Sequence, residues 1–173
     1  MDSDRVVLLD EAGQRCGTLA KADVHGAHTP LHLAFSVYVF DASGRLLVTR
    51  RSLAKLTWPG VWTNSCCGHV RPGEAAEEAA QRRLEEELSL TTSHLELVLP
   101  HFAYRAVSPE GIVENEVCPV FTTTVDRDPV GDPDEVAQWE WADWTTFCDI
   151  VARSPWLVSP WAALQVPLLA ARL

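Results

Sequence analysis

The sequence predicts one domain of the α+β class, in which mixed β-sheets are flanked by helices, and three observations support this. The chain has 173 residues, of which 47% are hydrophobic, and this suits one well-filled core. Short apolar runs alternate with turn residues, as in hairpins. One long stretch has the spacing of an amphipathic helix and contains neither Gly nor Pro. We therefore expect a single domain over residues 1–173, since no repeat or linker divides the chain.

The predicted strands are mostly arranged as hairpins. Two β-branched runs flank the turn at residues 41–44, and two longer runs flank the turn at residues 108–111. A short strand before the first hairpin and another after the second complete the set. In chain order, the predicted strands are residues 6–9, 33–40, 46–50, 95–107, 112–125 and 136–141.

Two helices and a fragmented C-terminal segment complete the predicted secondary structure. Residues 74–88 form the clearest helix, and residues 143–152 are also helical in pattern. The apolar stripe of the first helix consists of Ala76, Ala80, Leu84 and Leu88. From Ser154 onward the chain is apolar, and we expect its prolines to break it into short helical pieces. These prolines are Pro155, Pro160 and Pro167.

Charge and composition exclude several classes of function. The chain has 14 Lys and Arg against 24 Asp and Glu, a net charge of −10, so a nucleic-acid backbone would repel it. A small anionic substrate is compatible with this charge if cations gather in one pocket. No apolar run approaches the length of a membrane span, and the N-terminal residues do not resemble a signal peptide. Five cysteines without a C-x-x-C pair indicate free thiols, so we expect a cytoplasmic protein.

Titratable side chains at short spacings indicate a site for chemistry. Glu114 and Glu116 lie two apart on a predicted strand and therefore project from the same face. If that face is buried, a cation or a proton must separate them; if it is solvated, they need no partner, and spacing alone leaves both possibilities open. His69 follows Cys67 by two residues, and His25 and His32 lie nearer the N-terminus. The other histidines, which we expect to be exposed or structural, are His28, His94 and His101.

The helix at residues 74–88 carries a second set of charges. Arg83 and Glu87 are four residues apart and share one edge of the helix. Glu85 belongs to a run of three glutamates and is expected to face solvent.

These residues resemble a known motif. Gly68, Glu74, Arg82, Leu84, Glu86, Glu87 and Leu90 are similar to the Nudix box, a loop and helix that hold a divalent metal against a diphosphate. Arg83 stands where the box usually has Glu, and Ser89 where it usually has Gly, and both departures count against a Nudix hydrolase.

Longer strings resemble one branch of that superfamily, the type I isopentenyl diphosphate isomerases, in which the second position of the helix box is often not Glu. The resemblance covers nearly the whole chain and implies a Nudix-like fold. Its strings are residues 31–36, 47–51, 63–69, 104–105, 111–121 and 159–161.

The resemblance implies interconversion of isopentenyl and dimethylallyl diphosphate by adding a proton at one carbon and removing one at another. It implies that Cys67 and Glu116 are catalytic, with Tyr104 beside Glu116. Cys66, the nearest rival thiol, would point to the opposite face of a strand. Trp161 would lie at the hydrocarbon end, where its ring could stabilise positive charge.

The resemblance also implies two cations and a diphosphate pocket. The ligands of a Mn²⁺ (or Zn²⁺) site, which Mg²⁺ could also occupy, would be His25, His32, His69, Glu114 and Glu116. Glu87 would help to hold Mg²⁺ arriving with the diphosphate, with a backbone contact from Cys67. The diphosphate itself would be bound by Lys21, Arg51, Lys55 and Arg83.

Two other functions stay open at this stage. A Nudix pyrophosphohydrolase would release phosphate, and a catalytically silent module would bind a metal or a prenyl diphosphate without turning it over. For all three functions the partner is a small diphosphate, with no nucleic acid or membrane involved, and we expect a monomer or a weak homodimer.

Overall fold

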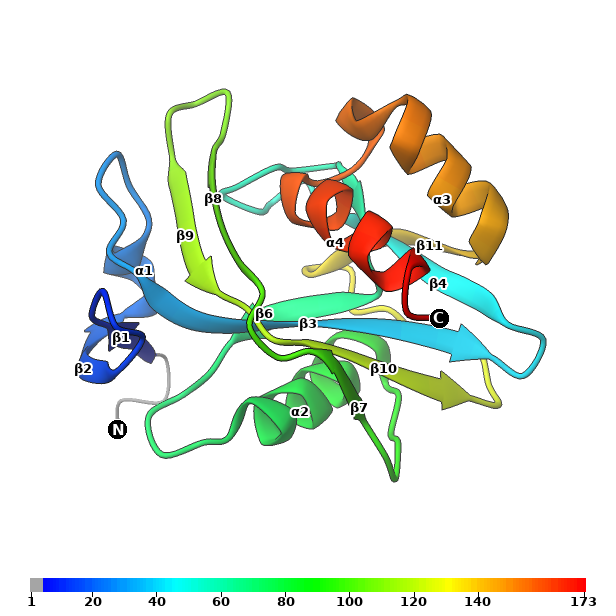
Figure 1. The fold of residues 1–173 in the computed structure, drawn as a ribbon, viewed down its shortest axis with the longest axis horizontal. Coiled ribbons are helices and arrows are strands. Elements are labelled where there is room, and N and C mark those ends of the chain that lie inside the picture. The colour runs from blue at the N-terminus through cyan, green and yellow to red at the C-terminus, as the bar shows by residue number, and fades with distance from the viewer. Residues whose placement is uncertain (1–4) are drawn as a thin grey trace.

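A computed structural model describes residues 5–173 and shows an 11-stranded sheet system built around β3 (His32–Asp41), which is the strand with the most neighbours (Figure 1). The other strands, in chain order, are β1 (Arg5–Leu9), β2 (Arg15–Ala20), β4 (Arg45–Arg51), β5 (Trp62–Thr63), β6 (Cys66–His69), β7 (Glu96–Leu99), β8 (Ala103–Val107), β9 (Val113–Val117), β10 (Val120–Val125) and β11 (Val136–Asp143).

The two ends of β3 belong to different parts of the sheet. At its start, His32 pairs with Leu8 of β1 on one side and with Glu116 of β9 on the other. Further along, β3 pairs with β6 and β4 on the first side and with β10 on the second. The β8–β9 hairpin therefore diverges from the rest of the sheet near the start of β3, as Figure 1 shows. Next to this divergence lies a pocket that Ser36 of β3 helps to line.

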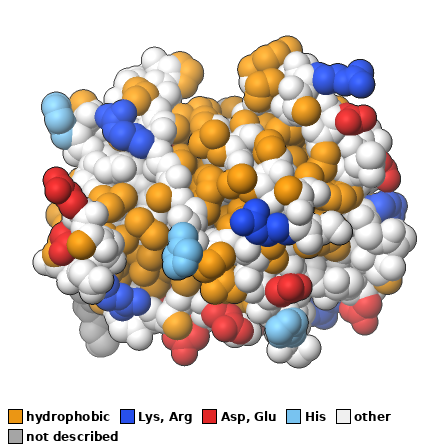
Figure 2. All heavy atoms as spheres, in the orientation of Figure 1, with side chains coloured by type: hydrophobic (Ala, Val, Ile, Leu, Met, Phe, Trp, Pro, Cys, Tyr) orange, Lys and Arg blue, Asp and Glu red, His pale blue; other side chains and the backbone are white. Residues whose placement is uncertain are grey.

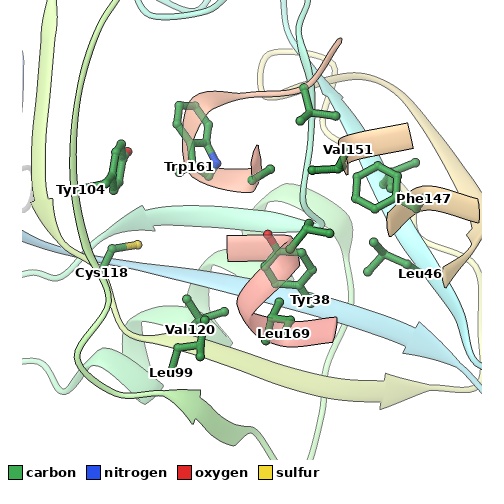
Figure 3. Packing of buried hydrophobic residues seen from close by; sticks show 14 of the residues in the cluster. Tyr38, Leu46, Leu99, Tyr104, Cys118, Val120, Phe147, Val151, Trp161 and Leu169 are labelled. Atoms are coloured by element: carbon green, nitrogen blue, oxygen red, sulfur yellow. The ribbon is translucent and has the colours of Figure 1, made fainter. Parts of the chain in front are cut away.

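Helices cover both faces of the sheet. They are α1 (Lys21–Val24), α2 (Ala76–Leu88), α3 (Trp144–Arg153), the 3₁₀ helix η1 (Pro155–Leu157) and α4 (Pro160–Ala170). Alternate residues of β3 serve the two faces: Phe35 and Val37 pack in the cluster with α2, whereas Tyr38 packs with α3 and α4. Figure 3 shows this second cluster, in which Tyr104 and Trp161 lie on the same side of β3.

Helix α2 begins at Ala76, two residues later than predicted. The Glu74 carboxylate accepts a hydrogen bond from the Arg71 N–H, and Glu78 accepts one from the Ala75 N–H, so these side chains end the loop and cap the helix. The last helical residue is Leu88, and the C-cap residue Ser89 has a left-handed φ of 52°. Ser89 thus occupies the conformation that explains why the Nudix box usually has Gly there.

Both predicted hairpins are confirmed, but the second is interrupted. Residues 95–107 and 112–125 each form two strands, paired as β8 with β9 and β7 with β10. Pro100 and Pro119 lie at the two breaks, where a residue without an N–H cannot continue the ladder. The Cys118 N–H donates to the Phe102 carbonyl and keeps the two halves of the hairpin together.

Parts of the prediction are wrong, and it also lacked α1, β5 and β6. Strand β2 was not expected, because its residues are mostly exposed and lack an apolar alternation. The C-terminal segment was expected to break at Pro167, but α4 continues through this residue. Pro167 faces solvent, so the carbonyl left without its helical partner can be hydrated. Pro160 starts α4 and Pro155 starts η1, as a first-turn proline can.

Hydrophobic and charged side chains occupy different parts of the surface. On the face drawn in Figure 2, hydrophobic side chains occupy the middle and charged side chains lie mostly around the margin. Within the described chain, no helix has the length and apolar character needed to span a bilayer.

Candidate active site and metal centre

One pocket of about 670 Å³ collects nearly all the side chains that the sequence singled out. Cys67, Tyr104 and Trp161 line it together with most of the expected metal ligands. It also holds seven of the 14 cationic side chains of the protein, which are Arg5, Lys21, Arg51, Lys55, Arg71, Arg82 and Arg83. An acidic protein thus concentrates positive charge in one cavity, as binding a small anion requires.

Strand register explains how the site is assembled. Ser36 of β3 pairs with Cys67 of β6, and His32 of β3 pairs with Glu116 of β9. Glu116 in turn pairs with Tyr104 of β8. Paired residues project from the same face of a sheet, and so do residues two apart on one strand. One face of the sheet therefore carries six of these side chains, which are His32, Cys67, His69, Tyr104, Glu114 and Glu116.

The three histidines and two glutamates form a compact cluster. One ligand atom from each of them lies within 4.8 Å of every other, and the residues are His25, His32, His69, Glu114 and Glu116. Their imidazole centroids are 5.0–5.2 Å apart. Glu114 and Glu116 are only 6% and 7% exposed, so the alternative of a solvated strand face is wrong.

Hydrogen bonding shows that this cluster fits a divalent cation. The His32 Nδ1–H donates to the Pro30 carbonyl at 2.9 Å, which leaves Nε2 turned toward the cluster. The buried atoms His25 Nε2, His32 Nε2 and Glu114 Oε2 have no hydrogen-bond partner. His25 Nε2 and Glu114 Oε2 are 2.8 Å apart without the geometry of a hydrogen bond. Buried polar atoms that converge without partners are what a metal ligand set requires.

Protonation states follow from burial and from these neighbours. Burial favours a neutral Glu116, but His32 and His69 outweigh it and hold the pKa of the carboxyl well below its usual range. His69 Nε2 is 3.2 Å from Glu116 Oε1 in a hydrogen bond. Burial lowers the pKa of His69, which favours the neutral imidazole that a metal needs.

Cys67 and Tyr104 hold their protons. Burial, opposed by the charge of Arg51, raises the pKa of the Cys67 thiol to about 12. Burial also raises the pKa of Tyr104 well above its ordinary value, with Glu116 adding to the effect. The structure confirms that Cys66 points the other way, because it packs in the core beneath α2.

Trp161 is fixed as part of the pocket wall. Its indole N–H donates to Asn64 Oδ1 at 2.9 Å, and the Asn64 amide donates to the carbonyls of Val37 and Cys66. The Trp161 ring lies 6.0 Å from the Tyr104 ring, centroid to centroid. Asn64 therefore links the strand that carries Cys67 to the helix that carries Trp161.

The cationic side of the pocket is organised by carboxylates. Arg83 forms ion pairs with Glu87 and Glu135, and Lys55 forms another with Glu135. The shared helix edge predicted for Arg83 and Glu87 is confirmed. Arg83 reaches the pocket over Gly68, where an added Cβ would lie 3.4 Å from Arg83 Cγ, so the backbone there has room for little else.

Some residues of the site carry no sequence signal. Asn64, Glu135 and Thr57 contact predicted site residues that are distant in the chain, namely Trp161, Arg83 and Glu114, and each is of a type that is usually a surface residue. Arg5 was not singled out either, since a lone arginine is common. Three other histidines, expected to be exposed or structural, are exposed: His28, His94 and His101.

Comparison with known proteins places the chain in a family. The family model of the NUDIX domain matches residues 30–162. An isopentenyl-diphosphate Delta-isomerase of Frankia alni is 55% identical over 163 residues, covering 94% of this chain and 84% of that protein. The enzyme of the same name from Leifsonia xyli is 55% identical over 168 residues, covering 96% and 91%.

Solved structures agree on the fold. The crystal structure of DR0079 from Deinococcus radiodurans has a TM-score of 0.75 at 21% identity, covering 94% of this chain and 97% of that one. The NUDIX domain of Shewanella oneidensis NrtR, solved with ADP ribose, has a TM-score of 0.64 at 13% identity, covering 84% and 90%. The chain therefore belongs to the Nudix superfamily and, within it, to the isopentenyl-diphosphate Delta-isomerase family.

Proposed function

We propose that this protein interconverts isopentenyl diphosphate and dimethylallyl diphosphate, using Cys67 and Glu116 as the proton-transfer pair. The observation that carries the proposal is the meeting, in one pocket, of a protonated thiol, an ionised carboxylate, an aromatic wall and a group of cations. The identity of more than half of the residues with named isomerases supports it.

The reaction needs one group that gives a proton and another that takes one. Adding a proton to the terminal alkene carbon of isopentenyl diphosphate leaves a tertiary carbocation, and losing a proton from the neighbouring methylene gives the isomer. In the resting site Cys67 has a proton to give to the alkene carbon, and the Glu116 carboxylate can accept the proton that the methylene loses. Tyr104, neutral and next to Glu116 in register, can donate a hydrogen bond to the carboxylate as its charge changes.

Trp161 forms the wall at the hydrocarbon end. The face of an indole ring attracts a cation by about 0.5–2 kcal/mol, and this attraction acts only once positive charge has developed. The ring carries no full negative charge, and its contribution is electrostatic attraction to the intermediate. Its hydrogen bond to Asn64 keeps the ring in place without an external partner.

Lys21, Arg51, Lys55 and Arg83 bind the diphosphate in this proposal. All four line the pocket, and arginine side chains match phosphate oxygens with two parallel N–H donors. Glu135 holds Lys55 and Arg83 near each other before substrate arrives.

Two cations complete the proposed site. The His/Glu cluster would hold Mn²⁺ (or Zn²⁺), whose positive charge would favour the ionised form of the Glu116 carboxylate. Mg²⁺ entering with the diphosphate, where the Glu87 side chain and the Cys67 backbone carbonyl would hold it, supplies charge neutralisation. Both assignments rest on the donor types, imidazole with carboxylate in the first case and hard oxygen in the second.

We further propose that the protein works in the cytoplasm. Five free cysteines within the described chain support a reducing compartment, where thiols stay unpaired. The pocket fits a small-molecule partner, and we propose a monomer or weak homodimer.

The test is proton NMR of isopentenyl diphosphate in D₂O with the purified protein, Mg²⁺ and Mn²⁺. We expect dimethylallyl diphosphate that carries solvent deuterium, and loss of this product with Cys67→Ala. Cys16→Ala is the matched control, because Cys16 is an exposed thiol on β2 outside the pocket lining. Release of phosphate without isomerisation would favour a hydrolase, and binding without turnover would favour a silent module.

A further inference from the structure

Thr57 lies between the two halves of the site. It belongs to the loop that joins β4 to β5 and is 6% exposed. Its side chain contacts the His/Glu cluster, and its main chain contacts a cation of the diphosphate side. No sequence pattern had marked it.

The Thr57 hydroxyl determines how the Glu114 carboxylate is turned. Thr57 Oγ1 donates to Glu114 Oε1 at 2.9 Å. The other oxygen, Oε2, is then directed to the cluster, where it lies 2.8 Å from His25 Nε2 and has no hydrogen-bond partner. Because the two oxygens of a carboxylate move together, a bond that fixes one of them aims the other.

The main chain of Thr57 performs a separate task. Its carbonyl accepts hydrogen bonds from Arg51 Nε at 3.1 Å and Arg51 Nη2 at 2.9 Å. These bonds hold the guanidinium where it also stacks, with its Cζ 5.2 Å from the centre of the Trp161 ring. A change of side chain at position 57 leaves both bonds to the carbonyl in place, although Thr57→Val also removes the longer bond that Thr57 Oγ1 accepts from Arg51 Nη2 at 3.3 Å.

We infer that Thr57 is a positioning residue of the cation site, whose hydroxyl orients Glu114 as a ligand. This inference rests on the proposed function, since it assumes that the His/Glu cluster binds a divalent cation. Partners that orient metal ligands in this way are typically worth about 10–100-fold in metal affinity. Four further donors surround the cation, so we place the effect of Thr57 at the lower end, about tenfold.

Two variants separate the hydroxyl from the packing of the side chain. Thr57→Val keeps the shape and removes the hydroxyl, whereas Thr57→Ser keeps the hydroxyl and removes a methyl group. A role in metal orientation predicts that Val is the more damaging change. A role in packing alone predicts the reverse order, because Ser leaves a small cavity and Val does not.

The experiment is calorimetric titration of Mn²⁺ into chelator-treated full-length protein, with the parent and both variants. We expect one equivalent to bind the parent, about tenfold weaker binding to Thr57→Val, and near-parental binding to Thr57→Ser. The KM for isopentenyl diphosphate should change less than Mn²⁺ binding in either variant, because the Thr57 carbonyl keeps both of its hydrogen bonds from Arg51.

The outcomes distinguish the inference from the function beneath it. Parental Mn²⁺ binding that Thr57→Val leaves unchanged, or that Thr57→Ser weakens as much, overturns the inference alone. A parent protein that binds no Mn²⁺ overturns the cation site and the inference with it.

Discussion

At about pH 8, Cys67 should react with an alkylating reagent far more slowly than an ordinary thiol, because burial in the pocket keeps the Cys67 thiol protonated. Only the thiolate attacks iodoacetamide, so the rate follows the thiolate fraction. Burial, against the opposing charge of Arg51, raises the pKa of Cys67 from 9.0 to about 12. A protonated resting thiol is also what the proposed proton donor must be.

The size of the effect follows from these two values. At pH 8, a thiol with a pKa of 9.0 is about one-tenth thiolate, and a thiol with a pKa of about 12 is about one part in ten thousand thiolate. The thiolate population of Cys67 is therefore lower by about a thousandfold. A higher pKa also makes each thiolate somewhat more nucleophilic, so the difference in rate is somewhat smaller than the difference in population.

The assay is alkylation of the chelator-treated protein between about pH 7 and pH 10, with each cysteine followed by peptide mass spectrometry. Cys16, an exposed thiol, serves as the internal reference for reagent and folding. The pH dependence separates protonation from simple shielding. A high pKa requires the rate at Cys67 to keep rising about tenfold per pH unit up to pH 10, whereas shielding lowers the rate without moving the curve. A rate that levels off near pH 9 would refute the argument and leave Cys67 without a held proton.

Four further outcomes follow from the same structure. Glu116→Gln should lower turnover by at least about 100-fold and also weaken Mn²⁺ binding; unchanged turnover with weakened binding would limit Glu116 to a ligand role. Trp161→Phe loses the hydrogen bond to Asn64, which should cost about 1–3 kcal/mol and lower the melting temperature by about 2–12 °C, and it should slow turnover by up to about 30-fold. Ser89→Gly relieves a left-handed φ of 52° and should raise the melting temperature by about 2–8 °C, as scanning calorimetry would detect. Mn²⁺ at about 100 times its Kd should stabilise the parent by about 2.7 kcal/mol, and His25→Ala should abolish most of the thermal shift.

Local patterns in the sequence were sufficient to predict several of the elements that carry the site. The alternation of a strand placed Glu114 and Glu116 on a shared face without knowledge of the fold. Strand β6, which carries Cys67 and His69, was not among the predicted strands. The uninterrupted helix from residue 76 likewise puts Arg83 and Glu87 on one edge. That the cluster of histidines and glutamates is one site was implied by resemblance, not by spacing.

Contacts between distant residues could not be predicted in this way. Thr57 meets Glu114 across 57 positions, Lys55 meets Glu135 across 80, and Trp161 meets Asn64 across 97. Each depends on how separate elements pack, and the chemical type of the residue gives no indication of it. Strand β2 escaped prediction for a different reason: an exposed edge strand buries little, so hydrophobic periodicity does not mark it.

The two departures from the Nudix box have different physical meanings. Arg83 replaces an expected carboxylate with a cation that pairs with Glu87 and Glu135, so this edge of the helix adds positive charge to the pocket. Fewer carboxylates remain to activate a water molecule against the diphosphate, while the His/Glu cluster near the start of β3 retains five donors of its own. This arrangement agrees with the proposed function, in which the diphosphate stays intact and Cys67 and Glu116 carry the proton transfers; the strand register aligns these two residues with Ser36 and His32 on one face of the sheet. Ser89, by contrast, changes only the cost of ending the helix.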